Sequence, residues 1–104
     1  MYDEDFIVTR ENTSGEARLI VSGRIDSINS DVLQLKLDEV LKDGQVNIKV
    51  NMLNVDYLSS NGIRVILKAY KDAKKADGKV RIEEPSESVK KVLILTSLEK
   101  MLTE

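Results

Sequence analysis

The serine pair Ser59-Ser60 is the place in this sequence where side chains could do chemistry. The pair follows the apolar Leu58, precedes Asn61-Gly62, and leads directly into an amphipathic segment. Residues at the start of a helix lie beside backbone N–H groups that have no partner within the helix, and the helix dipole adds positive potential there. Such a place accommodates an anion such as a phosphate group. The plainer interpretation is a helix cap, because serine is a preferred N-cap residue.

The sequence lacks two residue types on which many catalytic mechanisms depend. It contains no cysteine and no histidine, which excludes thiol nucleophiles, disulfides, serine–histidine catalysis, and zinc sites built on thiolate or imidazole. Asp26 and Asp56 could form a carboxylate pair for acid–base catalysis or metal binding, but solvated loop charges are the commoner case. No glycine-rich phosphate-binding loop is present. We therefore expect a binding protein that is not an enzyme and that uses no cofactor or metal.

The charge balance gives no reason to expect nucleic acid or a membrane as a partner. Lys and Arg total 16 against 18 Asp and Glu, a net charge of -2, whereas phosphate backbones are bound by a clear positive excess. No apolar run approaches the ~20 residues of a membrane span, and the acidic N-terminal segment does not resemble a signal peptide. With 104 residues, of which 41% are hydrophobic, we expect a single cytoplasmic domain over residues 1–104.

The first half of the chain shows the pattern of a hairpin followed by a helix. Residues 6–9 and 17–22 are apolar and β-branched, and the turn residues at 12–15 separate them, so the two runs predict a β-hairpin. Apolar residues at helical spacing predict a helix over about 31–43, with Asn29 or Ser30 as its N-cap. The apolar stripe of this helix consists of Leu33, Leu37, Val40 and Leu41.

The second half alternates strands and helices. Strict alternation over 45–52 predicts a strand, residues 53–58 a connection, and 80–82 a last strand. The helix that opens at 59–62 should bury Ile63, Ile66, Leu67, Tyr70 and Ala73. A third helix, with Pro85 in its first turn, should bury Val89, Val92, Leu93 and Leu98. The order ββαβαβα predicts an α/β fold with a four-stranded mixed sheet.

Three motifs, in this order along the chain, resemble the STAS domains of anti-sigma-factor antagonists. Residues 21–26 resemble a strand end of the form Val-x-Gly-x-hydrophobic-Asp. Residues 58–67 resemble the family signature, in which a loop with Asp-Ser or Ser-Ser is followed by a small residue, Gly, and Leu or Ile opening a helix. Residues 93–98 resemble the C-terminal motif Leu-x-hydrophobic-Thr-x-Leu. The resemblance covers nearly the whole chain and implies a single STAS-like domain.

The resemblance implies a regulatory cycle that serine phosphorylation controls. The unphosphorylated antagonist binds an anti-sigma factor that is also a serine kinase, which frees the sigma factor. Phosphorylation releases the antagonist, and a serine phosphatase of the metal-dependent type reverses it. The residue that matches the phosphoacceptor is Ser60, with Ser59 as the alternative, and Asp26 matches an acidic residue near that serine. The implied partner-binding residues here are Asp26, Ser59, Ser60, Asn61 and Gly62.

Two positions depart from the family pattern. Ser59 stands where the family often has Asp, which leaves open which of the two serines is modified. Asn51 stands at the predicted end of the third strand, where Asp is common. If that carboxylate contributes to recognition in relatives, this chain uses a different partner geometry.

Ile94 is the remaining candidate for partner binding. The helical period places it outside the core stripe of the third helix, so it is either a scattered surface residue or part of a partner-binding patch. The alternative function keeps the fold and changes the role. In it, the chain is a STAS-type regulatory or structural subunit of a transporter or signalling assembly, without a phosphoswitch, and Ser60 only caps its helix.

Overall fold

The computed structural model describes residues 5–104, which form four strands and four helices. In chain order the elements are β1 (Ile7–Thr13), β2 (Glu16–Ile25), α1 (Asn29–Lys42), β3 (Asn47–Leu58), α2 (Ser60–Lys75), β4 (Lys79–Glu83), α3 (Glu87–Leu95) and α4 (Glu99–Thr103). None of the helices in this described part has the length and apolar composition needed to cross a bilayer.

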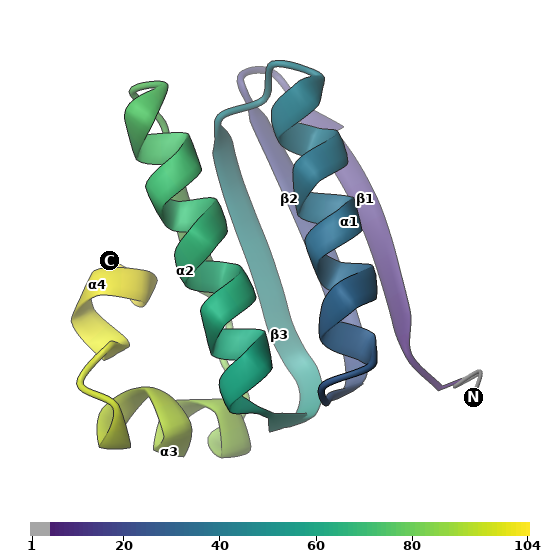
Figure 1. The fold of residues 1–104 in the computed structure, drawn as a ribbon, viewed down its shortest axis with the longest axis vertical. Coiled ribbons are helices and arrows are strands. Elements are labelled where there is room, and N and C mark those ends of the chain that lie inside the picture. Colours follow the sequence, from purple (N-terminus) through teal and green to yellow (C-terminus); the bar gives the residue numbers. More distant parts are fainter. Residues whose placement is uncertain (1–4) are drawn as a thin grey trace.

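The strands form one sheet in the order β1-β2-β3-β4. The β1–β2 hairpin is antiparallel, and β2–β3 and β3–β4 are parallel pairs connected through α1 and α2. Figure 1 shows α1 and α2 side by side on one face of this sheet, with α3 running crosswise near the start of α2, on the side away from α1. The predicted α/β class and the four-stranded mixed sheet are confirmed.

The core lies between the sheet and the two long helices. Helix α1 buries Leu33, Leu37 and Val40 as predicted, and Leu41 packs at the margin of the core. The buried face of α2 differs from the predicted stripe. Ile66 and Ala73 are buried as expected, but Val65 and Ala69 are also buried, because α2 packs on α1 as well as on the sheet. The other predicted stripe residues are partly buried: Ile63, Leu67 and Tyr70.

Strand β3 continues through residues 53–58, where the sequence predicted a connection. The reason is an irregular pairing with β2, whose register shifts between Ile20 and Ser22 and again between Gly23 and Arg24. Each shift interrupts the alternation of side chains between the two faces, so the period-two pattern is lost although the strand continues. The same irregular part of the ladder lengthens β2 to Ile25.

The C-terminal segment contains a fourth helix that the sequence did not predict. Pro85 lies before α3 and not within its first turn, and Ser86 is the N-cap, with its Oγ accepting from the Val89 N–H. After α3, Ser97 adopts a positive φ of 60°, which turns the chain into α4. Leu98 therefore packs on the core from the start of α4 and not from α3. A helix as short as α4 offers too few residues for a periodic pattern.

Candidate functional site

The Ser59-Ser60 segment and Asp26 leave the sheet at the same edge. Strands β2 and β3 are parallel, and Ile25 pairs with Leu58 at their carboxyl ends. The Ser59 N–H donates to the Ile25 carbonyl at 2.9 Å, which continues the ladder by one bond. The starts of α1 and α2 therefore lie next to each other at this end of the molecule (Figure 1). Two motifs that are far apart in the sequence are brought together in this way.

The two serines make different contacts. Ser59 is the N-cap of α2: its backbone is extended, it is half-buried, and its Oγ accepts from the Gly62 N–H at 3.1 Å. Ser60 is the first residue of the helix, is exposed, and makes no side-chain hydrogen bond within residues 5–104. The oxygen of Ser59 is thus engaged inside the protein, whereas the hydroxyl of Ser60 is free to meet a partner.

Gly62 lets the first turn of α2 approach the strand ends. A Cβ at this position would lie 2.6 Å from Ile25 Cγ2 and 2.7 Å from Leu58 Cδ1, closer than real Cβ atoms approach carbon. Gly62 is buried, so its contribution to the site is to position its neighbours. A larger residue would require either the Ile25 and Leu58 side chains or the first turn of α2 to shift.

Asp26 organises the start of α1. Its Oδ1 accepts from the backbone N–H groups of Ile28 at 3.1 Å and Asn29 at 2.8 Å. The prediction that Asn29 or Ser30 caps this helix is wrong. Both lie inside α1, where their buried side chains donate to backbone carbonyls of the preceding segment. Asp26 satisfies these free N–H groups instead, so its carboxylate has a structural task at the start of α1.

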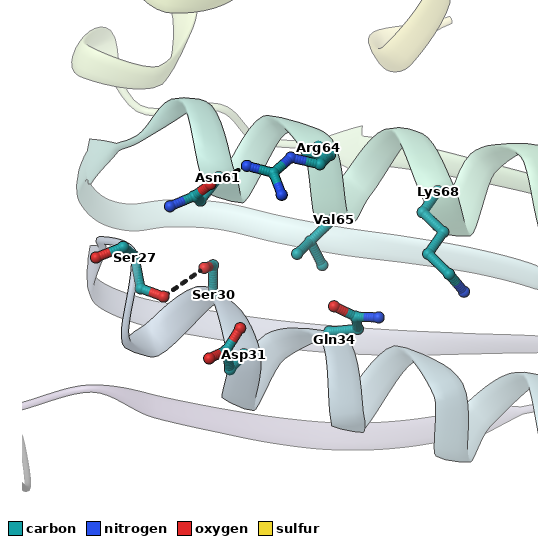
Figure 2. A pocket seen from close by; sticks show the side chains of 8 residues that line it. All are labelled: Ser27, Ser30, Asp31, Gln34, Asn61, Arg64, Val65 and Lys68. Atoms are coloured by element: carbon teal, nitrogen blue, oxygen red, sulfur yellow. Dashed lines mark hydrogen bonds between the residues drawn. The ribbon is translucent and has the colours of Figure 1, made fainter.

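A polar groove of about 320 Å³ separates the first turns of α1 and α2. Figure 2 shows side chains from both helices pointing into it. Its lining residues are Ser27, Ser30, Asp31, Gln34, Asn61, Arg64, Val65 and Lys68. Asn61 is half-buried, and its Oδ1 accepts a hydrogen bond from the Arg64 guanidinium. Arg64 was not among the residues predicted from the sequence, although its spacing of four residues from Ser60 on a helix was a signal that could have identified it.

Arg24 and Tyr57 form an exposed pair beside the site. They are partners in the β2–β3 ladder, and the Arg24 guanidinium carbon lies 4.3 Å from the centroid of the Tyr57 ring. Tyr and Arg are enriched among the residues that dominate binding at protein interfaces. The sequence analysis missed this pair. A signal was present, because Tyr57 is an aromatic residue directly before the serine loop in a chain with only 4% aromatic residues.

Ile94 lies on the exposed side of α3, as the helical period predicts. Its side chain is 58% exposed, and the adjacent Leu95 is 83% exposed, whereas Leu93 is fully buried. Figure 1 places α3 at the same end of the molecule as the start of α2. The structure thus adds Leu95 to the candidate apolar patch. The role of Ile94 in binding stays a prediction.

Asn51 does not end its strand, contrary to the sequence prediction. It lies within β3, opposite Glu83 of β4, and its Nδ2 donates to Glu83 Oε2 at 3.1 Å. An aspartate here could not donate that bond when ionised and would add a like charge. The amide therefore suits the local electrostatics of this chain.

Asp26 and Asp56 belong to no metal-binding group, since residues 5–104 contain no cluster of three or more potential acidic, Cys or His ligands.

Comparison with known proteins agrees with this fold. The family model of the STAS domain matches residues 8–103. The chain is 25% identical over 96 residues to the "Anti-sigma F factor antagonist" of Paenibacillus polymyxa, covering 91% of this chain and 82% of the relative. It is 24% identical over 92 residues to the "Anti-sigma-B factor antagonist" of Bacillus subtilis (strain 168), covering 88% of this chain and 84% of the relative.

Solved structures show the same fold. The anti-sigma factor antagonist SpoIIAA in its unphosphorylated form superposes with a TM-score of 0.82 at 18% identity, covering 94% of this chain and 86% of that one. The Bacillus cell fate determinant SpoIIAA in the phosphorylated form gives a TM-score of 0.75 at 17% identity, covering 94% and 89%. The protein described here belongs to the STAS domain family, and the curated relatives reported above are named as anti-sigma factor antagonists.

Proposed function

We propose that this protein is an anti-sigma-factor antagonist whose binding is switched by phosphorylation of Ser60. Unphosphorylated, it binds an anti-sigma factor that is also a serine kinase, and it thereby regulates transcription that depends on a sigma factor. The kinase transfers a phosphoryl group to Ser60 and the complex separates. A serine phosphatase of the metal-dependent type restores the binding form. The cycle runs in the cytoplasm, without direct binding to nucleic acid or a membrane.

One observation carries the choice of acceptor. The Ser60 hydroxyl is exposed and free of hydrogen bonds to the described residues, while the adjacent Ser59 hydroxyl accepts from the Gly62 N–H and is half-buried. A kinase must reach the acceptor oxygen from solvent and align it with the phosphoryl group. The Ser60 oxygen can be reached without breaking any hydrogen bond of α2, whereas modification of Ser59 would break the bond that caps this helix.

The surface around Ser60 supports protein binding and not turnover. Asn61 follows it in the chain, and Asp26 follows Ile25, whose carbonyl accepts from the Ser59 N–H. The exposed Arg24–Tyr57 pair offers the residue types of a binding hot spot. We assign Ile94 to the margin of the same surface because α3 lies at the end of the fold where α2 begins (Figure 1). The partner supplies the ATP chemistry, and this chain supplies the serine and a complementary surface.

Phosphorylation acts on the interface more than on the fold. It adds about -1.5 to -2 charges and three acceptor oxygens to Ser60. The start of α2 tolerates an anion because the helix dipole is positive there. A partner surface shaped for a neutral hydroxyl must instead meet a hydrated dianion, with the Asp26 carboxylate nearby. A penalty of about 3–4 kcal/mol weakens binding roughly a hundred- to several-hundred-fold, since each ~1.4 kcal/mol is a factor of ten.

The test uses the kinase that co-purifies with the protein from its host, with ATP, intact-mass measurement and a binding assay. Wild type should gain one phosphate and lose binding, and Ser60→Ala should bind without being modified or released. Ser60→Asp should show part of the binding loss. The matched control is Ser59→Asn, which removes the neighbouring hydroxyl but keeps a residue able to cap α2. It should still be phosphorylated.

Two results would contradict this proposal. Phosphate on Ser60→Ala but not on Ser59→Asn would move the switch to Ser59. Absence of phosphate on wild type, together with recovery of a transporter or scaffold subunit instead of a kinase, would favour a STAS-type subunit without a phosphoswitch. Thermal melting of each variant shows that the compared proteins are folded.

A further inference from the structure

The Arg64 side chain lies one helical turn from Ser60 and points back toward the start of α2. Both residues are on α2 at i and i+4, a spacing that places their Cβ atoms about 5–6 Å apart on one face. Side chains on a helix lean toward its N-terminus. Figure 2 shows this direction, with the Arg64 guanidinium reaching the preceding turn at Asn61, the residue next to Ser60.

The Arg64 guanidinium has no anionic partner in the described part of the chain. Its hydrogen-bond acceptor is the neutral amide oxygen of Asn61, and no carboxylate of residues 5–104 lies within ion-pair distance. Lys68, the other cation lining the groove, differs. Its ammonium is 2.9 Å from Asp72 and 3.9 Å from Asp38. Arg64 is therefore the cation here whose charge is not already neutralised by an ion pair.

A guanidinium suits the group that phosphorylation would create. Its planar fork binds phosphate oxygens through two parallel hydrogen bonds, which a lysine cannot reproduce. To bind the phosphate, Arg64 must give up its hydrogen bond to the Asn61 oxygen. That acceptor is neutral and the bond is exposed, so breaking it costs little free energy. Asp31, on the α1 side of the groove, faces the same space and disfavours a position of the phosphate deep in the groove. The phosphate is thus expected to stay on the α2 side.

We infer that Arg64 is an intramolecular clamp for the phosphate of phosphorylated Ser60. On phosphorylation, the guanidinium exchanges the Asn61 oxygen for two phosphate oxygens and holds the phosphate against the first turns of α2. This inference rests on the proposed function for its biological meaning. It adds that the phosphorylated form has a defined, internally paired surface, in which both the Ser60 hydroxyl and the Arg64 fork are withdrawn from the partner.

The experiment installs phosphoserine at position 60 during translation, so that no kinase is needed. The second pKa of the phosphate is then measured by a phosphorus NMR titration in the wild-type background, in Arg64→Ala and in Arg64→Lys. In the wild-type background this pKa should lie below the value of about 6 for free phosphoserine. Arg64→Ala should raise it by roughly half a unit or more, and Arg64→Lys should restore only part of the shift.

Lys68→Ala is the matched control, because it removes the same charge from the same helix one turn farther from Ser60. It should change the phosphate pKa much less than Arg64→Ala does. Equal effects of the two variants on the phosphate pKa would indicate a general electrostatic effect of positive charge on α2 and would overturn the clamp. An unchanged phosphate pKa in Arg64→Ala would also overturn it. A second readout is the melting temperature, which installed phosphoserine should raise in the wild-type background but not in Arg64→Ala. Failure of a kinase to modify Ser60 would contradict the proposed function and leave this titration unaffected.

Discussion

The two neighbouring serines show how hydrogen bonding separates residues of the same type. Ser59 and Ser60 are chemically identical and adjacent, so residue type alone cannot distinguish an acceptor from a cap. The bond from the Gly62 N–H to Ser59 Oγ assigns the cap to Ser59 and leaves the Ser60 hydroxyl exposed. The assignment then follows from backbone geometry, because the N-cap position alone has an extended backbone and an oxygen aimed at the first turn.

Substitution of the single residue Ile94 tests whether α3 belongs to the partner-binding surface. Ile94→Asp should leave the melting temperature nearly unchanged, because a 58% exposed side chain contributes little to the core. It should weaken binding of the co-purifying partner if α3 belongs to the interface. Calorimetry and a binding titration measure the two effects separately.

Leu35→Asp is the control for this substitution. Leu35 is also a large apolar residue on the exposed face of a helix, with a side chain that is 65% exposed, but it lies on α1. It should leave binding close to that of wild type. Unfolding of the Ile94 variant would place Ile94 in the core and end its assignment to a partner surface. Equal loss of binding in both variants would point to the added charge and not to an apolar patch.

Among the elements, the long helices and the parallel strands determine where the site lies. Strands β2 and β3 run in the same direction, so the helices that follow them start at one edge of the sheet. Asp26 caps the first helix and Ser59 the second, which holds both starts in place. The arrangement depends on α1 and α2 staying packed on the sheet through their apolar faces.

Leu37→Ala tests that packing. Leu37 is 1% exposed between α1 and the sheet, so its truncation should lower the free energy of unfolding by roughly 2–5 kcal/mol. Denaturant unfolding followed by circular dichroism gives this value. Leu35→Ala, the same substitution two residues away on the exposed side of α1, should change stability by less than about 0.5 kcal/mol. Similar losses in both variants would mean that the apolar face of α1 is wrongly assigned.

Across the whole molecule, a cluster of side chains ties three strands together on the sheet. Arg18 of β2 donates to Glu83 of β4 through two bonds, at 2.6 and 3.1 Å, and Asn51 of β3 donates to the same carboxylate at 3.1 Å. Partial burial, the largest single influence, raises the pKa of Glu83. The hydrogen bonds from Arg18 and Asn51, with the charges of Arg18 and Lys49, together outweigh it, so the pKa lies below its ordinary value.

This lowered pKa predicts a pH dependence of stability. A carboxyl group whose pKa is lower in the folded protein stabilises it fully above the unfolded pKa of about 4.3, and this stabilisation is lost as the pH falls through the folded value. Glu83→Gln should therefore be less stable than wild type at pH 7, and the difference should shrink on acidification to about pH 3. Urea unfolding at a series of pH values measures it.

Glu84→Gln serves as the comparison, because Glu84 is the adjacent exposed carboxylate and makes no ion pair with the described residues. Its unfolding curve should follow that of wild type at each pH. A difference between Glu83→Gln and wild type that is constant with pH would show that the cluster contributes through packing and not through ionisation of Glu83.

Much of the architecture was predictable because it rests on local patterns. The stripe of Leu33 and Leu37 and the alternation around Val50 each reflect a period within one segment. Their order along the chain then predicted the mixed sheet, and the motif around Ser60 predicted the candidate site. The parts of the fold that the sequence missed are those without a local signal, namely the second half of β3 and the short α4.

The tertiary structure decided the details on which function depends. The bonds that Asp26 and Ser59 accept are local, each spanning two or three residues, but neighbouring residues of equally suitable type compete for each position, and the path of the chain at the sheet edge selects among them. The continuation of β3, by contrast, depends on its irregular pairing with β2, a distant segment. The same holds for the groove in which Arg64 meets Asn61 without a carboxylate partner among the described residues. The strand pairing and the groove depend on distances between segments, and no periodicity within a single segment encodes them.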